Sequence, residues 1–128
     1  MTKIEVGAFR VRAGGGLKRA MAVGGDIRAG LIVTANVGDV ARLDVDLLSV
    51  SASSVSRDFI DRAHRSGKEV HVWTVNHPAN MNTMIHLGVD SIITDVPDLA
   101  SELLIERSRM NDAERAFLVI DDFLKRRL

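Results

Sequence analysis

The sequence predicts an α/β domain in which parallel strands alternate with helices. Residues 70–75 and 90–94 are short runs rich in valine and isoleucine, and a helical pattern lies between them. Strands joined by a helix in this way run parallel and form a right-handed crossover. Two earlier apolar runs, 29–36 and 45–52, are typical of parallel strands that are buried on both faces. About four strand–helix units are therefore expected.

Three helices are expected between and after these strands. Over 54–66 apolar side chains recur at helical spacing, and Gly67 can end that helix. Pro78 suits the first turn of a second helix that ends before Gly88. Pro97 opens a third helix in the same way.

A last helix is expected at the end of the chain, from about Asp112 to Arg127. Asn111 and Glu114 have the spacing of a capping pair. A stripe of apolar residues at helical spacing is expected to be the buried face. It consists of Ala113, Ala116, Phe117, Ile120 and Leu124. We therefore interpret 111–128 as an amphipathic C-terminal helix.

Composition places the chain in the class of globular proteins with one domain, 1–128. With 46% hydrophobic residues it can bury a core. Seventeen basic residues balance seventeen acidic ones, so no nucleic acid or anionic membrane is expected as a partner. No apolar run is long enough for a transmembrane segment, and because the first ten residues carry charges, no signal peptide is expected. The compartment is unknown, with a cytoplasmic location favoured.

The first 28 residues are poorly defined by their pattern, because clusters of glycine interrupt it. Gly14-Gly15-Gly16 matches neither a Walker loop, which ends in Lys and Ser or Thr, nor a dinucleotide fingerprint. A loop is the expected interpretation of this cluster.

Two linked motifs carry a resemblance to a known family. The first is Trp73-Thr74-Val75-Asn76 after a lead of Gly67, Lys68 and Val70; the second is Gly88-Val89-Asp90 followed by Ile93-Thr94-Asp95 and Pro97. Together they resemble the end of the glycerophosphodiester phosphodiesterase family, and the resemblance covers roughly residues 28–104. The pair of motifs is much more specific than either one alone.

The resemblance implies a fold and an activity. The resemblance implies a TIM barrel fold. It also implies an enzyme that hydrolyses glycerophosphodiesters to glycerol 3-phosphate and an alcohol with a divalent cation such as Mg, Ca or Mn. The fold class implied here is α/β, the C-terminal part of a TIM (β/α)8 barrel with about four strand–helix units, incomplete as given. Its last four strands are expected to contain Leu31, Leu47, Val72 and Ile92, or to lie close to them.

The catalytic and metal motifs of the family are not matched by this chain. They comprise a His-Arg-Gly after the first strand, acidic metal ligands, a second His and a later Glu. The nearest stretch, His64-Arg65-Ser66-Gly67, has an inserted Ser and is placed at a helix end, where the dipole explains a His. We therefore assign no catalytic residue and no metal ligand, and expect the isolated chain to be inactive.

The resemblance does imply a substrate-binding role for Trp73 and Asn76, at the carboxyl end of their strand. An indole there can pack against glycerol carbons and an amide can donate hydrogen bonds. Strand alternation allows Trp73 to be a core residue instead. Asp95, at the end of the next strand, is expected to cap the helix at Pro97. His77 is expected either to cap the Pro78 helix or to face water.

Three hypotheses of function remain open. The chain is the C-terminal part of a phosphodiesterase whose N-terminal half-barrel supplies the chemistry; or it is a non-catalytic module for glycerophosphate binding or assembly; or it is a small open α/β domain of unrelated function. Half a barrel leaves two open sheet edges, so the expected partners are the missing half-barrel or a second copy through self-association.

Overall fold

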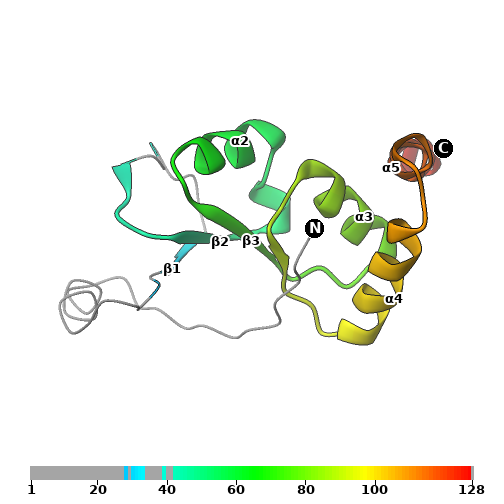
Figure 1. Cartoon of the computed structure of the whole chain (residues 1–128), viewed down its shortest axis with the longest axis horizontal. Helices are drawn as coiled ribbons and strands as arrows, with labels where there is room; N and C mark the ends of the chain where they lie inside the picture. The colour runs from blue at the N-terminus through cyan, green and yellow to red at the C-terminus, as the bar shows by residue number, and fades with distance from the viewer. Residues whose placement is uncertain (1–27, 29, 34–38, 40–41, 128) are drawn as a thin grey trace.

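The structure is a computed structural model, and it describes residues 28, 30–33, 39 and 42–127. The expectations for the first 27 residues, including the glycine cluster Gly14–Gly16, lie outside this part of the chain. Four strands and four α-helices follow one another in the described residues (Figure 1). They are β1 (Gly30–Val33), β2 (Leu47–Ser51), α2 (Arg57–Arg65), β3 (Glu69–Trp73), α3 (Pro78–Leu87), β4 (Ser91–Ile92), α4 (Pro97–Ser108) and α5 (Asp112–Arg127), with a 3-10 turn, η2 (Ala52–Ser54), after β2.

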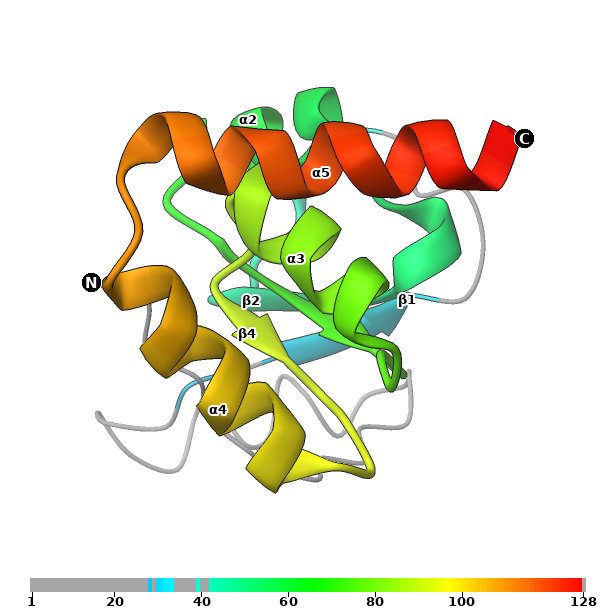
Figure 2. The ribbon, with the colours of Figure 1, turned by 90° about the vertical axis from the view of Figure 1, so that its right-hand side faces the viewer.

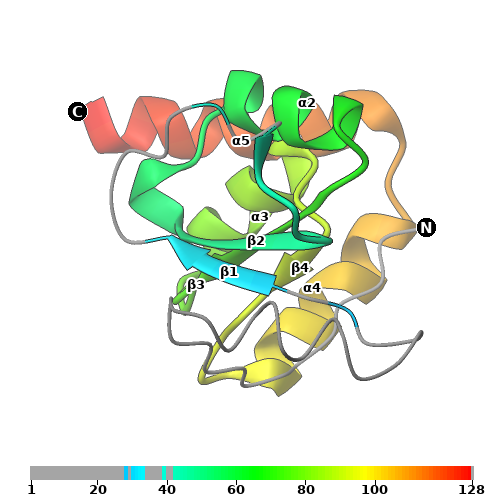
Figure 3. The same cartoon turned by 90° about the vertical axis from the view of Figure 1, so that its left-hand side faces the viewer.

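The four strands form one parallel sheet in the order β1-β2-β3-β4. Figure 3 shows β1 beside β2, at one edge of this sheet. Because each crossover is right-handed, a sequential order places the connecting helices on the same face. Figure 1 agrees, since α2, α3 and α4 follow one another in an arc around one side of the sheet. A doubly wound sheet reverses its order and carries helices on both faces, whereas a barrel does not.

The expected positions of the four strands are confirmed. Leu31, Leu47, Val72 and Ile92 lie on β1, β2, β3 and β4 respectively. β2, β3 and β4 are shorter than their apolar runs. β4 in particular pairs regularly only over two residues, although the backbone N–H of Ile93 still donates to the carbonyl of Val72 at 2.8 Å.

One hydrophobic core lies between the sheet and its helices. Register pairs the buried side chains across the strands, with Val50 beside Val72 and Val72 beside Ile92. Side chains from the helices complete this core, among them Ile60, Ala63, Met81, Met84, Ala100 and Leu103. The other face of the sheet carries Ser49, His71 and Ser91 in one row, and its side chains are not part of the core cluster. The sheet therefore has one apolar face and one mostly polar face.

The predicted helix ends are largely confirmed. Pro78 and Pro97 lie in the first turns of α3 and α4, and Gly67 and Gly88 adopt the positive φ angles of 72° and 94° that end a helix. α2 begins later than expected, because the side chain of Ser56 accepts a hydrogen bond from the N–H of Phe59 and caps it.

The expected buried stripe of the C-terminal helix is wrong. The capping pair is present, since Asn111 Oδ1 accepts from the N–H of Glu114 at 2.9 Å and Glu114 Oε2 accepts from the N–H of Asn111 at 2.9 Å. However, Phe117, Ile120 and Leu124 are 65%, 55% and 55% exposed. α5 packs on α3 rather than on the sheet, and Figure 2 shows it lying across that helix. The apolar stripe faces away from the rest of the molecule.

Within the described residues, no helix has both the length and the apolar character needed to cross a bilayer.

Leu48→Ala is expected to lower the free energy of unfolding by about 2–5 kcal/mol, because Leu48, on β2, is fully buried in the core. The matched control is Leu47→Ala on the same strand, whose side chain is half-buried on the opposite face. Its loss is expected to be clearly smaller. Urea unfolding of both variants measures the two losses, and equal losses would contradict a core on one side of the sheet.

Candidate functional site

Polar side chains collect where β3 and β4 end, at the carboxyl edge of the sheet. Beyond the regular strands the two backbones stay together, because the N–H of Val75 donates to the carbonyl of Ile93 at 3.0 Å. This pairing places Asn76, which follows β3, beside Thr94 and Asp95, which follow β4. Loops at this edge are where parallel α/β folds build their functional sites. Trp73, the last residue of β3, lies at the same edge. We call Trp73, Asn76, Thr94 and Asp95 together the rim.

Asn76 connects the two strand ends through three hydrogen bonds. Its Oδ1 accepts from the hydroxyl of Thr94 at 3.0 Å and from the backbone N–H of Asp95 at 2.9 Å. Its Nδ2 donates to Oδ2 of Asp95 at 2.9 Å. Because a backbone N–H can only donate, the atom of Asn76 that it meets must be the carbonyl oxygen, which fixes the amide orientation.

The network leaves polar capacity facing solvent. Asn76 and Asp95 are exposed, whereas Thr94 is only 8% exposed. An amide nitrogen carries two protons and a carboxylate has two oxygens. Within the described residues, the hydrogen bonds found use one proton of Asn76 Nδ2 and one oxygen of Asp95. An exposed donor and an exposed acceptor therefore remain next to each other on the rim.

Trp73 lies on the sheet face away from the helices. It is the last residue of β3, pairs with Ser51, and is half-buried outside the core cluster. Its indole Nε1 is buried and has no hydrogen-bond partner among the described residues. Its peptide bond to Thr74 is cis. The side chain therefore places part of its aromatic surface on the side of the sheet that would be the inside of a barrel, while its N–H is buried.

The expectation that Asp95 caps α4 is wrong. The N-cap residue of α4 is Val96, and no side chain caps it through a hydrogen bond. The carboxylate of Asp95 is held by Asn76 instead, and the backbone N–H of Val96 donates to the hydroxyl of Thr94 at 3.1 Å. His77 is the N-cap residue of α3, but its side chain makes no capping hydrogen bond and is exposed.

The opposite end of the same strands is held by Asp90. Its Oδ2 accepts from the backbone N–H of Val70 at 2.7 Å and lies 2.7 Å from Nε2 of His64. The carboxylate therefore joins the start of β4 to the start of β3 and to the end of α2. Sequence analysis explained His64 by the helix dipole alone and missed this partner, which is 26 residues away. Amino ends of barrel strands serve stability rather than catalysis.

A second charged cluster missed by sequence analysis lies on the polar face of the sheet. Glu69 Oε2 is 2.9 Å from Nε2 of His71, and Glu69 Oε1 is 2.8 Å from a guanidinium nitrogen of Arg28. Partial burial raises the pKa of Glu69, but the hydrogen bonds and charges of His71 and Arg28 outweigh it, so the pKa is lowered overall. The spacing of two residues on one strand was the signal that could have revealed the Glu69–His71 pair.

Fold and site together define a class. A sequential parallel sheet with helices on one face and a polar rim at its carboxyl edge is the arrangement of a (β/α)8-barrel enzyme. The sequence profile of the glycerophosphoryl diester phosphodiesterase family matches residues 31–99, which is more than half of the chain. The chain belongs to this family.

Individual relatives agree with this assignment. The chain is 44% identical over 50 residues to the "Probable glycerophosphodiester phosphodiesterase 2" of Mycobacterium tuberculosis, which covers 39% of this chain and 19% of that protein. Among solved structures, a protein from Silicibacter pomeroyi assigned to the glycerophosphoryl diester phosphodiesterases superposes with a TM-score of 0.62 at 25% identity, covering 70% of this chain and 34% of that one.

A further structure shares the fold. It is an Oleispira antarctica phosphodiesterase in complex with the product sn-glycerol-3-phosphate, with a TM-score of 0.62 and 21% identity, covering 69% of this chain and 37% of that one. The chain thus spans about a fifth of the length of the curated relative and about a third of the solved ones. It corresponds to about four strand–helix units of an incomplete barrel.

The divalent cation implied by the family does not fit the residues of this rim. Asp95 is its one carboxylate, and hard cations need several oxygen ligands. No group of three or more His, Asp or Glu side chains in the described residues could hold a metal ion. The described residues therefore give no basis for a metal-dependent step.

Asn76→Asp is expected to destabilise the chain by about 1–2 kcal/mol at neutral pH, because it replaces a donor with a carboxylate oxygen against Oδ2 of Asp95. The loss should shrink at acidic pH, where carboxyl groups become protonated. The double variant Asn76→Asp/Asp95→Asn restores a donor opposite an acceptor and is expected to recover most of the loss. Urea unfolding tests this, and equal stability of the single and double variants would contradict the network.

Glu69 is expected to make stability depend on pH. Since its pKa is lower in the folded chain, the carboxylate stabilises the fold above its unfolded pKa, and this contribution is lost as pH falls through the folded value. The side chain is 40% exposed, so we expect at most about 1 kcal/mol. Urea unfolding from pH 7 down to the acidic range compares the parent with Glu69→Gln. A variant that loses stability as steeply as the parent would refute this role.

Proposed function

We propose that this chain provides the carboxyl-end rim of the last four strands of a glycerophosphodiester phosphodiesterase barrel. In this function it binds the glycerol phosphate part of a glycerophosphodiester, while the rest of the barrel supplies the acid, the base and the metal ligands. The product of the complete protein would be glycerol 3-phosphate and an alcohol. The single observation that carries the proposal is the rim itself, built within the matched family segment at the edge where barrels bind substrates.

Trp73 and Asn76 have separate roles in this proposal. The half-buried indole of Trp73 packs against the carbons of glycerol; because its N–H is buried, the contact is made through the ring. The second amide proton of Asn76 donates to a ligand hydroxyl or phosphate oxygen, while its other contacts hold it in place. A product complex of the related Oleispira antarctica phosphodiesterase supports a ligand of this kind.

The two edges of the sheet support the need for a complementary half. Within the described residues, β1 and β4 lie at these edges. In a closed barrel the edges are paired with neighbouring strands. The proposed partner is therefore an N-terminal half-barrel, with the divalent cation held by that partner. A cytoplasmic location belongs to the same proposal.

A chimera tests the proposed function. Residues 28–128 are fused behind the N-terminal half of the Mycobacterium tuberculosis relative, with the 128-residue chain alone as the comparison. Release of glycerol 3-phosphate from glycerophosphocholine is measured with magnesium, calcium or manganese and with EDTA. We expect turnover from the chimera that EDTA abolishes, and none from the chain alone. Turnover by the chain alone would contradict the division of roles.

Within the chimera, Trp73→Ala is expected to raise KM about tenfold, since it removes contact area with the substrate. Leu47→Ala, on the same face of the sheet but at the amino end of β2, is the control and should leave KM unchanged. A folded chimera that binds glycerol 3-phosphate without any turnover would favour the alternative of a non-catalytic binding module.

A further inference from the structure

The outer face of α5 is an apolar surface without a partner in the described part of the chain. Phe117, Ile120 and Leu124 lie at intervals of three and four residues, so they share one side of the helix. Phe123 borders them and is also 55% exposed. The helix also has a less exposed side, on which Leu118 and Val119 are half-buried. We call Phe117, Ile120, Phe123 and Leu124 the α5 stripe.

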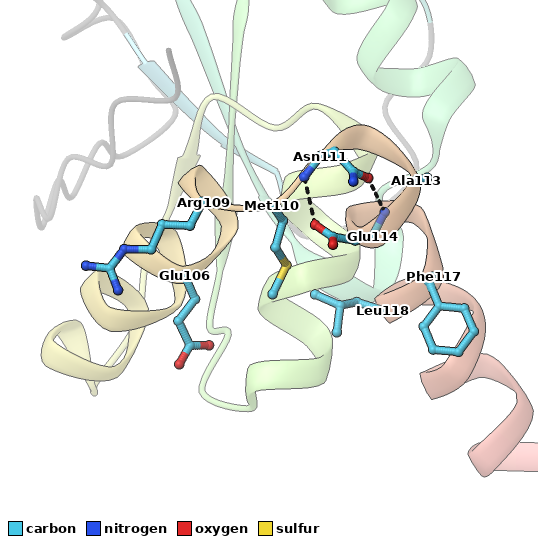
Figure 4. Close-up of a pocket in the computed structure, with 8 residues that line it drawn as sticks. All are labelled: Glu106, Arg109, Met110, Asn111, Ala113, Glu114, Phe117 and Leu118. Carbon is cyan, nitrogen blue, oxygen red and sulfur yellow. Dashed lines mark hydrogen bonds between the residues drawn. The ribbon is translucent and has the colours of Figure 1, made fainter.

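An open pocket of about 750 Å³ continues this surface at the junction of α4 and α5. Figure 4 shows Met110, Phe117 and Leu118 around it, with the side chains of Glu106 from α4 and of Arg109, which follows α4, nearby. Phe117 belongs to both the pocket and the α5 stripe. A side chain of a bound helix could therefore enter the pocket while its neighbours cover the stripe.

Charge is distributed along α5 so that the helix complements itself when reversed. Asp112 and Glu114 lie in the first turn, and Lys125, Arg126 and Arg127 lie at the other end. Over the whole helix four acidic residues balance four basic ones. The guanidinium of Arg127 lies 4.7 Å from the ring centre of Phe123, so this positive charge is at the edge of the stripe. An antiparallel second copy would bring each acidic end against a basic end.

We propose that the α5 stripe is a docking surface for α5 of a second copy of this chain, in an antiparallel pair with twofold symmetry. With the axis between Ile120 and Asp121, Phe117 of one copy faces Leu124 of the other. The same register places Glu114 opposite Arg127. One self-complementary patch of this kind forms a closed dimer rather than a fibre.

The position of α5 separates this surface from the one that would complete the barrel. In Figures 1 and 2, α3 lies between α5 and the sheet, whereas a half-barrel must pair with the edge strands β1 and β4. A lipid surface fits less well, because amphipathic helices that bind anionic membranes carry excess Lys and Arg, and α5 is neutral. A second copy of α5 would cover the apolar stripe and would bring the acidic and basic helix ends together.

The size of the patch sets the expected strength of the pair. Four side chains that are each more than half exposed present an area on the order of a few hundred Å². Stable complexes bury about 800 Å² on each partner. We therefore expect a weak dimer whose population rises with protein concentration.

Cysteine crosslinking tests the pair directly, because the chain has no cysteine of its own. Ile120→Cys places one thiol next to the proposed axis, and Glu102→Cys places one on an exposed position of α4 as the control. Under mild oxidation at a concentration where sedimentation detects the dimer, Ile120→Cys is expected to form a disulfide-linked dimer and Glu102→Cys is not. A chain that sediments as a monomer at every concentration, or equal crosslinking of the two variants, would overturn the proposal.

Adding Phe117→Asp to Ile120→Cys is expected to remove most of the crosslink and to weaken dimerisation at least about tenfold. Phe117 is 65% exposed, so circular dichroism and thermal unfolding should show an unchanged fold. Retention of the crosslink in this double variant would contradict docking through the α5 stripe.

Flotation with vesicles of phosphatidylcholine and phosphatidylglycerol tests whether lipid covers the α5 stripe instead. A monomeric chain that binds these vesicles, and loses binding with Phe117→Asp, would show that lipid covers the stripe and would overturn the proposal.

Discussion

The pairing of β3 with β4 is the constraint on which the rest of the structure depends, because both the helical arc and the rim are positioned by it. Side chains hold this pair at its two ends. Asp90 joins the amino ends through the N–H of Val70 and also holds His64 of α2, and Asn76 joins the carboxyl ends through Thr94 and Asp95. Regular pairing covers only two residues of β4, so these contacts supply much of the register. They join the two linked sequence motifs in space.

Burial on one side of the sheet explains how these four strands and their helices are held together. The face toward α2, α3 and α4 is closed by valine, isoleucine and methionine side chains, which are nearly fully buried. The other face carries serine, histidine and glutamate, with Glu69 held by Arg28 and His71. This polar composition contrasts with the apolar face, so the hydrophobic core of the described residues lies on one side of the sheet only.

The proposed function divides binding and chemistry between two parts of a barrel. The rim holds an indole, an amide and one carboxylate, and the described residues contain no cluster of metal ligands. Catalytic groups would have to come from other strands, as they do in barrels generally. α5 lies outside this arrangement, because α3 separates it from the sheet. We assign its apolar outer face to contact with a second copy of the chain rather than to the core of its own copy.

The sequence by itself determined the strand–helix order, the helix ends at proline and glycine, and the family. These features depend on local periodicity, on the backbone limits of those two residues and on motifs within one segment. It did not determine that Asp95 is held by Asn76 instead of capping α4, that His64 contacts Asp90, or that the stripe of α5 points outward. Each of these depends on residues brought together from distant positions, and a helical pattern does not reveal which of two apolar sides meets a neighbour. Only the tertiary structure decided them, because packing selects the partners that a side chain contacts, while the sequence pattern fixes only which side chains are able to make such contacts.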